Sequence, residues 1–172
     1  MSAYRHNASF GKREEFTAIA DLIRRGYDTY VTLVDDQGID CVIRQGPEKY
    51  FDIQIKARSK NCVPRNAGFF PLLHIKNPRK SYVFIFYSEM CELNGKAGVY
   101  WVIPSDKIAE PRFGNVLKSG KNKGKFRLHL TNHSRKTEKV TPRPKYIEYV
   151  GAFDRFLGKP LFDPAKEACP VT

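Results

Sequence analysis

The sequence predicts a domain of the α/β class, with α+β as the alternative, in which helices flank a mixed central β-sheet. Three observations support this fold class. Residues 9–25 carry apolar side chains at helical spacing, and a similar pattern returns at 145–158. Between them lie short segments rich in β-branched and aromatic residues. The chain of 172 residues fits a single domain.

The first helix is predicted over residues 9–25. Ser9 is suited to the N-cap position, and Gly26 stands where a left-handed C-terminal cap is expected. The apolar positions that should face the core are Phe16, Ile19, Ala20, Leu22 and Ile23.

Several strands are predicted after this helix. Residues 27–34, 39–44 and 50–58 read as consecutive strands, and the last two have a register that fits a hairpin. Residues 81–88 are apolar on both faces, which indicates a central strand, and 99–104 form a further strand.

The remaining segments are predicted as connections, short elements and a closing helix. Residues 59–80 are expected to be irregular, 105–110 a short helix capped by Ser105, and 126–131 a last short strand. Residues 145–158 should form one C-terminal helix that packs on the sheet through Tyr146, Ile147, Val150, Phe153 and Leu157. The domain is therefore expected to span residues 1–158, and 159–172 to form a tail.

The charge of the chain favours a polyanionic partner. Lys and Arg number 30 against 18 Asp and Glu, a net charge of +12. Nucleic acid is the commonest partner of such a protein, although the excess could serve solubility alone. Residues 118–127 hold no acid and are predicted to form a mobile loop that contacts phosphates through Lys118, Lys121, Lys123 and Lys125. Arg58 and Lys60, with Arg65, Lys76, Arg79 and Lys80, belong either to a solvated face or to a nucleic-acid groove.

Other features of the sequence narrow the location and the chemistry. No long apolar run and no apolar leader are present, so we expect a cytoplasmic protein without a membrane span. The scattered Cys41, Cys62, Cys91 and Cys169 are predicted to be free thiols. His129 and His133 lack a further ligand that would complete a zinc site.

Four polar residues are candidates for a catalytic site. Glu15 falls at the edge of the buried face of the first helix, whereas Glu14 points away from it. Asp40 begins the second strand, and Gln54 and Lys56 share one face of the third because side chains alternate along a strand. Their oxygen atoms suit Mg²⁺ or Mn²⁺, which would assist phosphodiester hydrolysis, and a lysine there could stabilise developing charge. Taken singly, each residue could equally be a surface or turn residue.

The run "GKREEF…LIRRGY…GID…FDIQIK" resembles the PD-(D/E)xK nuclease superfamily over about residues 10–60. It is similar to archaeal Holliday-junction resolvases and closer to intron-encoded homing endonucleases that carry a Gln-x-Lys motif. The resemblance implies a restriction-endonuclease-like fold. It also implies a site in which Asp40, Gln54 and the backbone carbonyl of Ile55 bind the metal, Glu15 helps to hold the metal or its water, and Lys56 is catalytic.

Two positions depart from the family pattern. Ile39 stands in place of a proline, which is a mild change. Gln54 stands in place of a carboxylate, so the metal shell would lose a negative charge unless Asp52 on the same strand face compensates. Asp52 could equally be a surface residue.

The sequence thus leaves two functional hypotheses. The first is a Mg²⁺- or Mn²⁺-dependent DNA endonuclease that, as the resemblance implies, leaves a 5′-phosphate. The second is a nuclease-fold module that binds nucleic acid without cutting it. RNA remains open as a substrate, and the two-fold symmetry of duplex DNA favours a homodimer or a higher symmetric oligomer.

Overall fold

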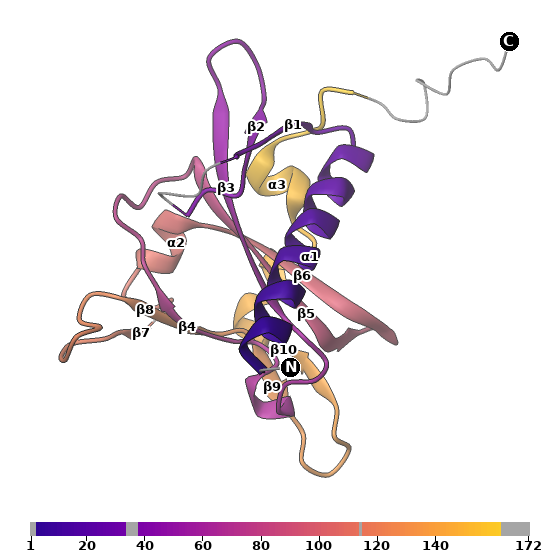
Figure 1. Ribbon diagram of the computed structural model, residues 1–172, viewed down its shortest axis with the longest axis vertical. Coiled ribbons are helices and arrows are strands. Elements are labelled where there is room, and N and C mark those ends of the chain that lie inside the picture. Colours follow the sequence, from indigo (N-terminus) through magenta and orange to yellow (C-terminus); the bar gives the residue numbers. More distant parts are fainter. Residues whose placement is uncertain (1–2, 34–37, 114, 163–172) are drawn as a thin grey trace, which may run out of the picture.

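A mixed sheet of five strands forms the centre of the molecule (Figure 1), known here from a computed structural model that describes residues 3–33, 38–113 and 115–162. In spatial order its strands are β1 (Asp28–Val31), β2 (Cys41–Arg44), β3 (Tyr50–Arg58), β5 (Tyr82–Leu93) and β6 (Lys96–Pro104). The first three form an antiparallel meander, β5 runs parallel to β3, and β6 returns antiparallel to β5. The predicted mixed α/β content and the predicted hairpin are confirmed.

One face of this sheet is covered by helix α1 (Ala3–Arg24) together with the short helix α3 (Phe153–Leu157). Ala18, Ile19 and Leu22 are buried against the sheet, where they contact a cluster that includes Cys41, Ile43, Ile53, Ile55, Val83 and Ile85. The predicted apolar stripe is wrong for two of its members, because Phe16 and Ile23 are 54% and 53% exposed. The helix is rotated so that the small Ala18 meets the sheet together with the predicted Ile19 and Leu22.

The start of α1 also differs from the prediction. The helix begins at Ala3, so Ser9 lies within it and does not cap it. Its end at Arg24 agrees with the expected position of Gly26, which has a φ of +84°. A Cβ atom at Gly26 would lie 2.1 Å from the backbone oxygen of Phe162, so the turn after α1 needs glycine for both its conformation and its space.

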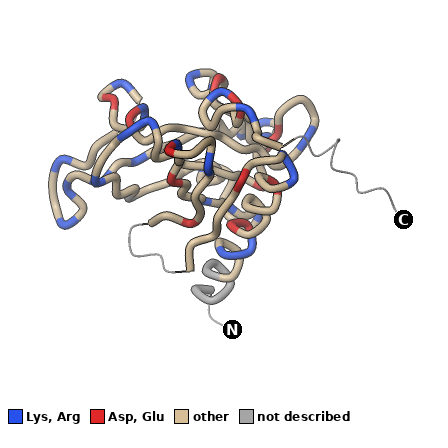
Figure 2. The backbone as a smooth tube through the Cα atoms, turned by 90° about the horizontal axis from the view of Figure 1, so that it is seen from above, with Lys and Arg blue, Asp and Glu red and all other residues tan. Residues whose placement is uncertain are grey.

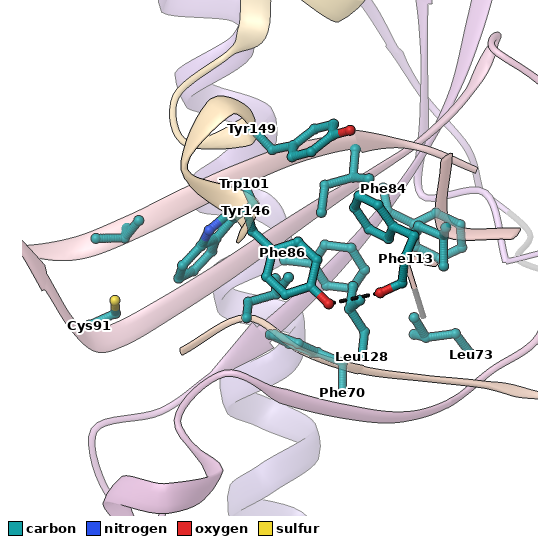
Figure 3. Close-up of a cluster of buried hydrophobic side chains, with 14 of the residues drawn as sticks. Phe70, Leu73, Phe84, Phe86, Cys91, Trp101, Phe113, Leu128, Tyr146 and Tyr149 are labelled. Carbon is teal, nitrogen blue, oxygen red and sulfur yellow. Dashed lines mark hydrogen bonds between the residues drawn. The ribbon is translucent and has the colours of Figure 1, made fainter. Parts of the chain in front are cut away.

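The opposite face is covered by small sheets and short helices. A three-stranded sheet holds β4 (Phe69–Leu73), β8 (Phe126–His129) and β7 (Asn115–Val116), and a two-stranded one holds β9 (Thr131–His133) and β10 (Val140–Pro142). The short helices are α2 (Ser105–Ala109) and the 3₁₀ turns η1 (Pro64–Asn66) and η2 (Pro144–Tyr149). Figure 3 shows the buried side chains that join these layers to the central sheet, among them Phe70, Phe84, Phe86, Trp101 and Leu128.

Two predictions about this second face are wrong. Residues 59–80 are not wholly irregular, because they contain β4, whose partner β8 lies more than fifty positions further along the chain. The predicted strand 126–131 is divided at Leu130, whose N–H donates to Gly68 O at 2.8 Å, and it contributes to two different sheets. Both differences depend on pairing between distant segments, which local patterns do not specify.

The single C-terminal helix predicted for 145–158 is also wrong. The segment forms η2 and α3, separated at Gly151, which has a φ of +61°. Val150 forms an antiparallel bridge to Trp101 of β6, and this extended backbone interrupts the helix. Gly158 does end α3, as expected.

The segment after α3 is not a free tail throughout. Phe162 N donates to Gly26 O at 3.2 Å, so residues 159–162 are attached to the turn that follows α1. The rest of the predicted tail lies outside the described residues. Ser105, in turn, does not cap α2, since its hydroxyl exchanges hydrogen bonds of 2.9 Å with the backbone N–H and carbonyl of Arg79. Among the described residues, no helix is long and apolar enough to cross a membrane.

Candidate functional site

Asp40 stands directly before β2 and is only 6% exposed. Its carboxylate Oδ2 accepts a hydrogen bond of 2.6 Å from the backbone N–H of Ile55, and its own N–H donates to Ile53 O at 2.8 Å. The carboxylate therefore occupies the place that a strand carbonyl would take beside β3. Because Ile55 lies between Gln54 and Lys56, this bond brings Asp40 to the predicted polar-x-Lys pair.

Glu15 approaches the same region from helix α1. Its side chain is 14% exposed and pairs with Lys12 at 2.5 Å. Burial, with further contributions from the charges of Asp40 and Glu15, raises the pKa of the Cys41 thiol to about 12. Both carboxylates thus lie close to one thiol, and that thiol stays protonated near neutral pH.

Glu14 lies elsewhere on the helix. Its charge acts on Tyr87 of β5, whose pKa is raised by burial first and by Glu14 next. The carboxylate of Glu14 also pairs with Arg13 at 3.0 Å. The Glu14 side chain is only 12% exposed and its charge acts on a tyrosine of the sheet, so the prediction that Glu14 points away from the buried face is wrong. Glu15 is the acid whose charge, with that of Asp40, acts on Cys41.

Gln54 and Lys56 project on the opposite face of β3 from α1. Ile53 and Ile55 pack in the cluster that includes α1, and alternation places Gln54 and Lys56 on the other side. There both residues line a cavity of about 510 Å³. Glu15 and Asp40 do not line this cavity, so the candidates are not all in one cavity: Gln54 and Lys56 lie on the face of β3 opposite α1, Glu15 lies on α1, and Asp40 stands just before β2.

Gln54 is held firmly in position. It is 8% exposed, and its Oε1 accepts a hydrogen bond of 3.1 Å from the hydroxyl of Tyr82. Parallel pairing aligns Gln54 with Phe84, so Tyr82 lies two residues earlier on the same face of β5. Tyr82 is a buried residue of the core, and nothing in its local sequence pattern indicates the parallel register that brings it to Gln54.

Gly38 closes the other side of the Gln54 amide. Its φ is +76°, and a Cβ atom there would lie 2.4 Å from Gln54 Nε2. The backbone before Asp40 therefore requires glycine for its left-handed conformation and for its close approach to Gln54.

Gly38→Ala is expected to lower the free energy of unfolding by about 1–3 kcal/mol, since it adds a left-handed alanine and displaces Gln54. Urea denaturation would measure the loss. Gly95→Ala is the matched control, because Gly95 has the same φ of +76° and open space around its Cβ position. Equal losses in the two variants would show that the contact with Gln54 contributes nothing.

The cavity beside Gln54 is strongly cationic. Besides Lys56, its lining includes Arg58, His74, Lys76 and Arg79, and no Asp or Glu of the described chain lines it. Lys56 forms no ion pair or hydrogen bond with any residue that the structure describes. Such a cavity is suited to an anionic group such as a phosphodiester.

Arg58 is part of the cavity wall. Its Nε donates to Phe69 O at 2.8 Å, and its guanidinium carbon lies 5.4 Å from the centre of the Phe70 ring. Burial lowers the pKa of Arg58 from its ordinary value. The remaining N–H groups of the guanidinium are those that could meet a phosphate.

Asp52 and Lys60 are engaged with other partners. Asp52 forms an ion pair with Arg79, which gives no support to the hypothesis that Asp52 compensates for the missing charge at Gln54. Lys60 Nζ lies 3.8 Å from Glu89 Oε1, and its side chain is largely exposed outside the cavity. The positive charge of Lys60 is therefore partly balanced.

The basic segment 118–127 forms the tip of the β7–β8 hairpin and the start of β8. Hydrogen bonds of 2.9 Å from Leu117 N to Lys125 O and from Gly124 N to Leu117 O close this tip. Lys118, Lys121 and Lys123 are exposed, while Lys125 Nζ donates to Asn122 at 3.1 Å. Figure 2 shows Lys and Arg positions, in blue, along the hairpin that extends away from α1.

Three oxygen donors near the start of β2 are of the kind that a hard cation prefers. They comprise one carboxylate, the amide of Gln54 and the carbonyl of Ile55, which points to the same side of β3 as the N–H that binds Asp40. Within the described residues, no three His, Cys, Asp or Glu side chains cluster as metal ligands. His129 contacts Arg143 and His133 contacts Glu138, so these two histidines are held apart in different networks.

Comparisons with protein-family profiles, with characterised proteins and with solved structures find no match to this chain. The functional argument therefore depends on the arrangement of the residues themselves.

Proposed function

We propose that the protein is a metal-dependent DNA endonuclease that hydrolyses phosphodiester bonds by means of metal-activated water. The observation that carries the proposal is the bond from Ile55 N to the Asp40 carboxylate, which ties Asp40 to the residue between Gln54 and Lys56, and these two residues line a cationic cavity. A buried carboxylate next to a lysine without an ion-pair partner is an arrangement that hydrolytic sites use.

Each residue has a distinct part in this proposal. Asp40, Gln54 and the Ile55 carbonyl would hold Mg²⁺ or Mn²⁺, with Glu15 near the same position from the α1 side. The cation supplies charge neutralisation at the phosphate and a lowered pKa of water. Lys56 stabilises the charge that develops on the phosphate, while Lys76 and Arg79 at the cavity bind neighbouring phosphate oxygens.

Supercoiled plasmid DNA is the simplest test of this activity. The purified protein is expected to convert it to the nicked form with Mg²⁺ or Mn²⁺ and to leave it intact with EDTA. A panel of linear duplex, nicked duplex, four-way junction and single-stranded RNA then compares the possible substrates. No cleavage of any of these with either metal would overturn the proposal.

A binding module without catalysis is the second candidate. It is favoured by one observation: the Gln54 oxygen that would contact the metal already accepts a hydrogen bond from Tyr82, and no carboxylate stands at this position. A carbonyl oxygen has two lone pairs, so this bond weakens the site without blocking it.

Calorimetry with Mg²⁺ and Mn²⁺ discriminates between the candidates. The endonuclease is expected to give a binding isotherm that Asp40→Asn abolishes. Asp52→Asn is the matched control and should retain binding, because Asp52 is paired with Arg79. A flat titration of the unaltered protein, combined with salt-sensitive DNA binding, would instead support the binding module.

A further inference from the structure

A second cationic cavity lies apart from the candidate catalytic residues. Its volume is about 360 Å³, and it is formed by residues of β4 and β8, by residues 111–113 and Asn115, and by residues from the segment 143–146. Five basic side chains line it, namely Arg112, Arg127, His129, Arg143 and Lys145. None of the Asp or Glu residues that the structure describes lines it.

Arg143 is fixed at the inner wall of this cavity. Its Nε donates to Thr131 O at 2.9 Å, and its Nη2 lies 3.1 Å from His129 Nδ1. Burial, and then the charge of Arg143, lower the pKa of His129, so the ring is neutral near pH 7 and Nδ1 accepts the bond. His129 thus positions the guanidinium, which retains further N–H donors.

The other cations differ in how far their charge is balanced. Arg112 pairs with Glu110 at 3.1 Å. Lys145 Nζ donates to Phe113 O at 3.0 Å, but within the described chain neither Lys145, Arg127 nor Arg143 forms an ion pair. Three positive side chains therefore line one cavity without a carboxylate, and an oxyanion with several acceptor oxygens would relieve their repulsion.

The position of the cavity indicates which kind of oxyanion binds there. Asn115 and Arg127 pair with each other at the base of the β7–β8 hairpin, and both line the cavity. The tip of that hairpin carries Lys118, Lys121 and Lys123. A long polyanion in contact with the hairpin tip would therefore also pass over the cavity at the base of the hairpin. A small free anion could occupy the cavity alone and would have no use for the lysines at the tip.

We propose that this second cavity is a binding site for a backbone phosphate of nucleic acid, separate from the cavity that contains Lys56. The neighbours Phe69 and Phe70 on β4 line the second and the first cavity respectively, so one strand separates the two sites. The choice of nucleic acid rests on the proposed function, whereas the affinity for phosphate follows from the cavity alone. The site anchors the duplex and takes no part in bond cleavage.

The test is DNA binding by the double variant Arg127→Gln/Lys145→Gln, measured by fluorescence anisotropy on a short duplex without divalent metal. Both side chains are exposed, so the fold should be retained. The affinity is expected to fall by about tenfold or more, and the slope of log K against log salt to become shallower by about 1.8, which is two contacts at 0.9 each. The control Arg135→Gln/Lys136→Gln removes two exposed charges from the β9–β10 turn. Its changes in DNA affinity and in salt slope should each be less than half of those in the Arg127→Gln/Lys145→Gln variant.

Inorganic phosphate distinguishes the possible sources of the ligand. Titration should shift the amide NMR signals of Asn115 and His129 in the unaltered protein and not in the double variant. Phosphate-induced shifts with unchanged DNA affinity would overturn the role in nucleic-acid binding and identify a small-phosphate site. If phosphate causes no NMR shifts and the double variant binds DNA as tightly as the unaltered protein, the proposal is overturned completely.

Cleavage assays separate this inference from the proposed function. If the protein is a nuclease, the double variant should need more DNA for half-maximal rate but should keep its rate at saturating DNA. If it cuts no DNA, the loss of affinity in the double variant still tests the second cavity, because that measurement requires neither metal nor catalysis.

Discussion

Lys56→Ala and Asp40→Asn are each expected to reduce the rate of plasmid nicking by about a hundredfold or more, the usual loss when a group that stabilises transition-state charge is removed. Lys56 lines the cationic cavity without an ion-pair partner among the described residues, so its removal should cost little stability. Asp40→Asn retains an amide oxygen that can accept the hydrogen bond from Ile55 N. The charge at the metal site is lost, while the local backbone arrangement is preserved.

The comparison needs a lysine with no part in the site. Lys96 stands at the β5–β6 turn, is exposed and does not line the cavity, so Lys96→Ala should cleave at the unaltered rate. Anisotropy measured without metal should show that Lys56→Ala retains DNA binding within a few-fold. A wild-type rate of nicking in either Lys56→Ala or Asp40→Asn would exclude the proposed site.

Phe86→Ala is expected to lower the free energy of unfolding by about 3–5 kcal/mol, the usual loss when a buried phenylalanine is truncated. Phe86 is fully buried on β5, with its ring centre 4.7 Å from that of Phe70 and 5.6 Å from that of Phe84 (Figure 3). The side chain joins β4 to the central sheet, and β4 forms a wall of both cavities. The loss therefore combines apolar burial with two aromatic contacts.

Chemical denaturation followed by intrinsic fluorescence would measure this change. Phe16→Ala removes the same side chain from the 54% exposed position on α1 and should cost less than about 1 kcal/mol. Similar losses for the two variants would contradict the assignment of Phe86 to the core between the two layers.

Local patterns predicted much of the central sheet. Strands expected at 39–44 and 50–58 appear as Cys41–Arg44 and Tyr50–Arg58, because alternating side chains and turn residues are properties of short segments. The same alternation placed Gln54 and Lys56 on one face of β3. Helical geometry favoured Glu15 over Glu14, but in the structure both side chains are largely buried, at 14% and 12% exposed.

Other elements could not be inferred in this way. Strand β4 carries Pro71 within "FFPLL" and exists as a strand through its pairing with β8, so its own sequence gives a weak signal. The C-terminal segment has a continuous helical pattern, but the bridge from Val150 to Trp101 interrupts it. In both cases a contact with a distant strand outweighs the local preference.

The sequence by itself determined the mixed α/β class, the hairpin that carries Gln54 and Lys56, and the excess of positive charge, because each depends on composition or on short-range periodicity. Only the tertiary structure decided that Asp40 binds Ile55 N, that Tyr82 reaches Gln54, and that Arg127, Arg143 and Lys145 line one cavity. These contacts require the parallel pairing of β3 with β5 and the packing of small sheets on the central one. Such pairings join residues far apart in the chain, and their energies depend on the whole packed core.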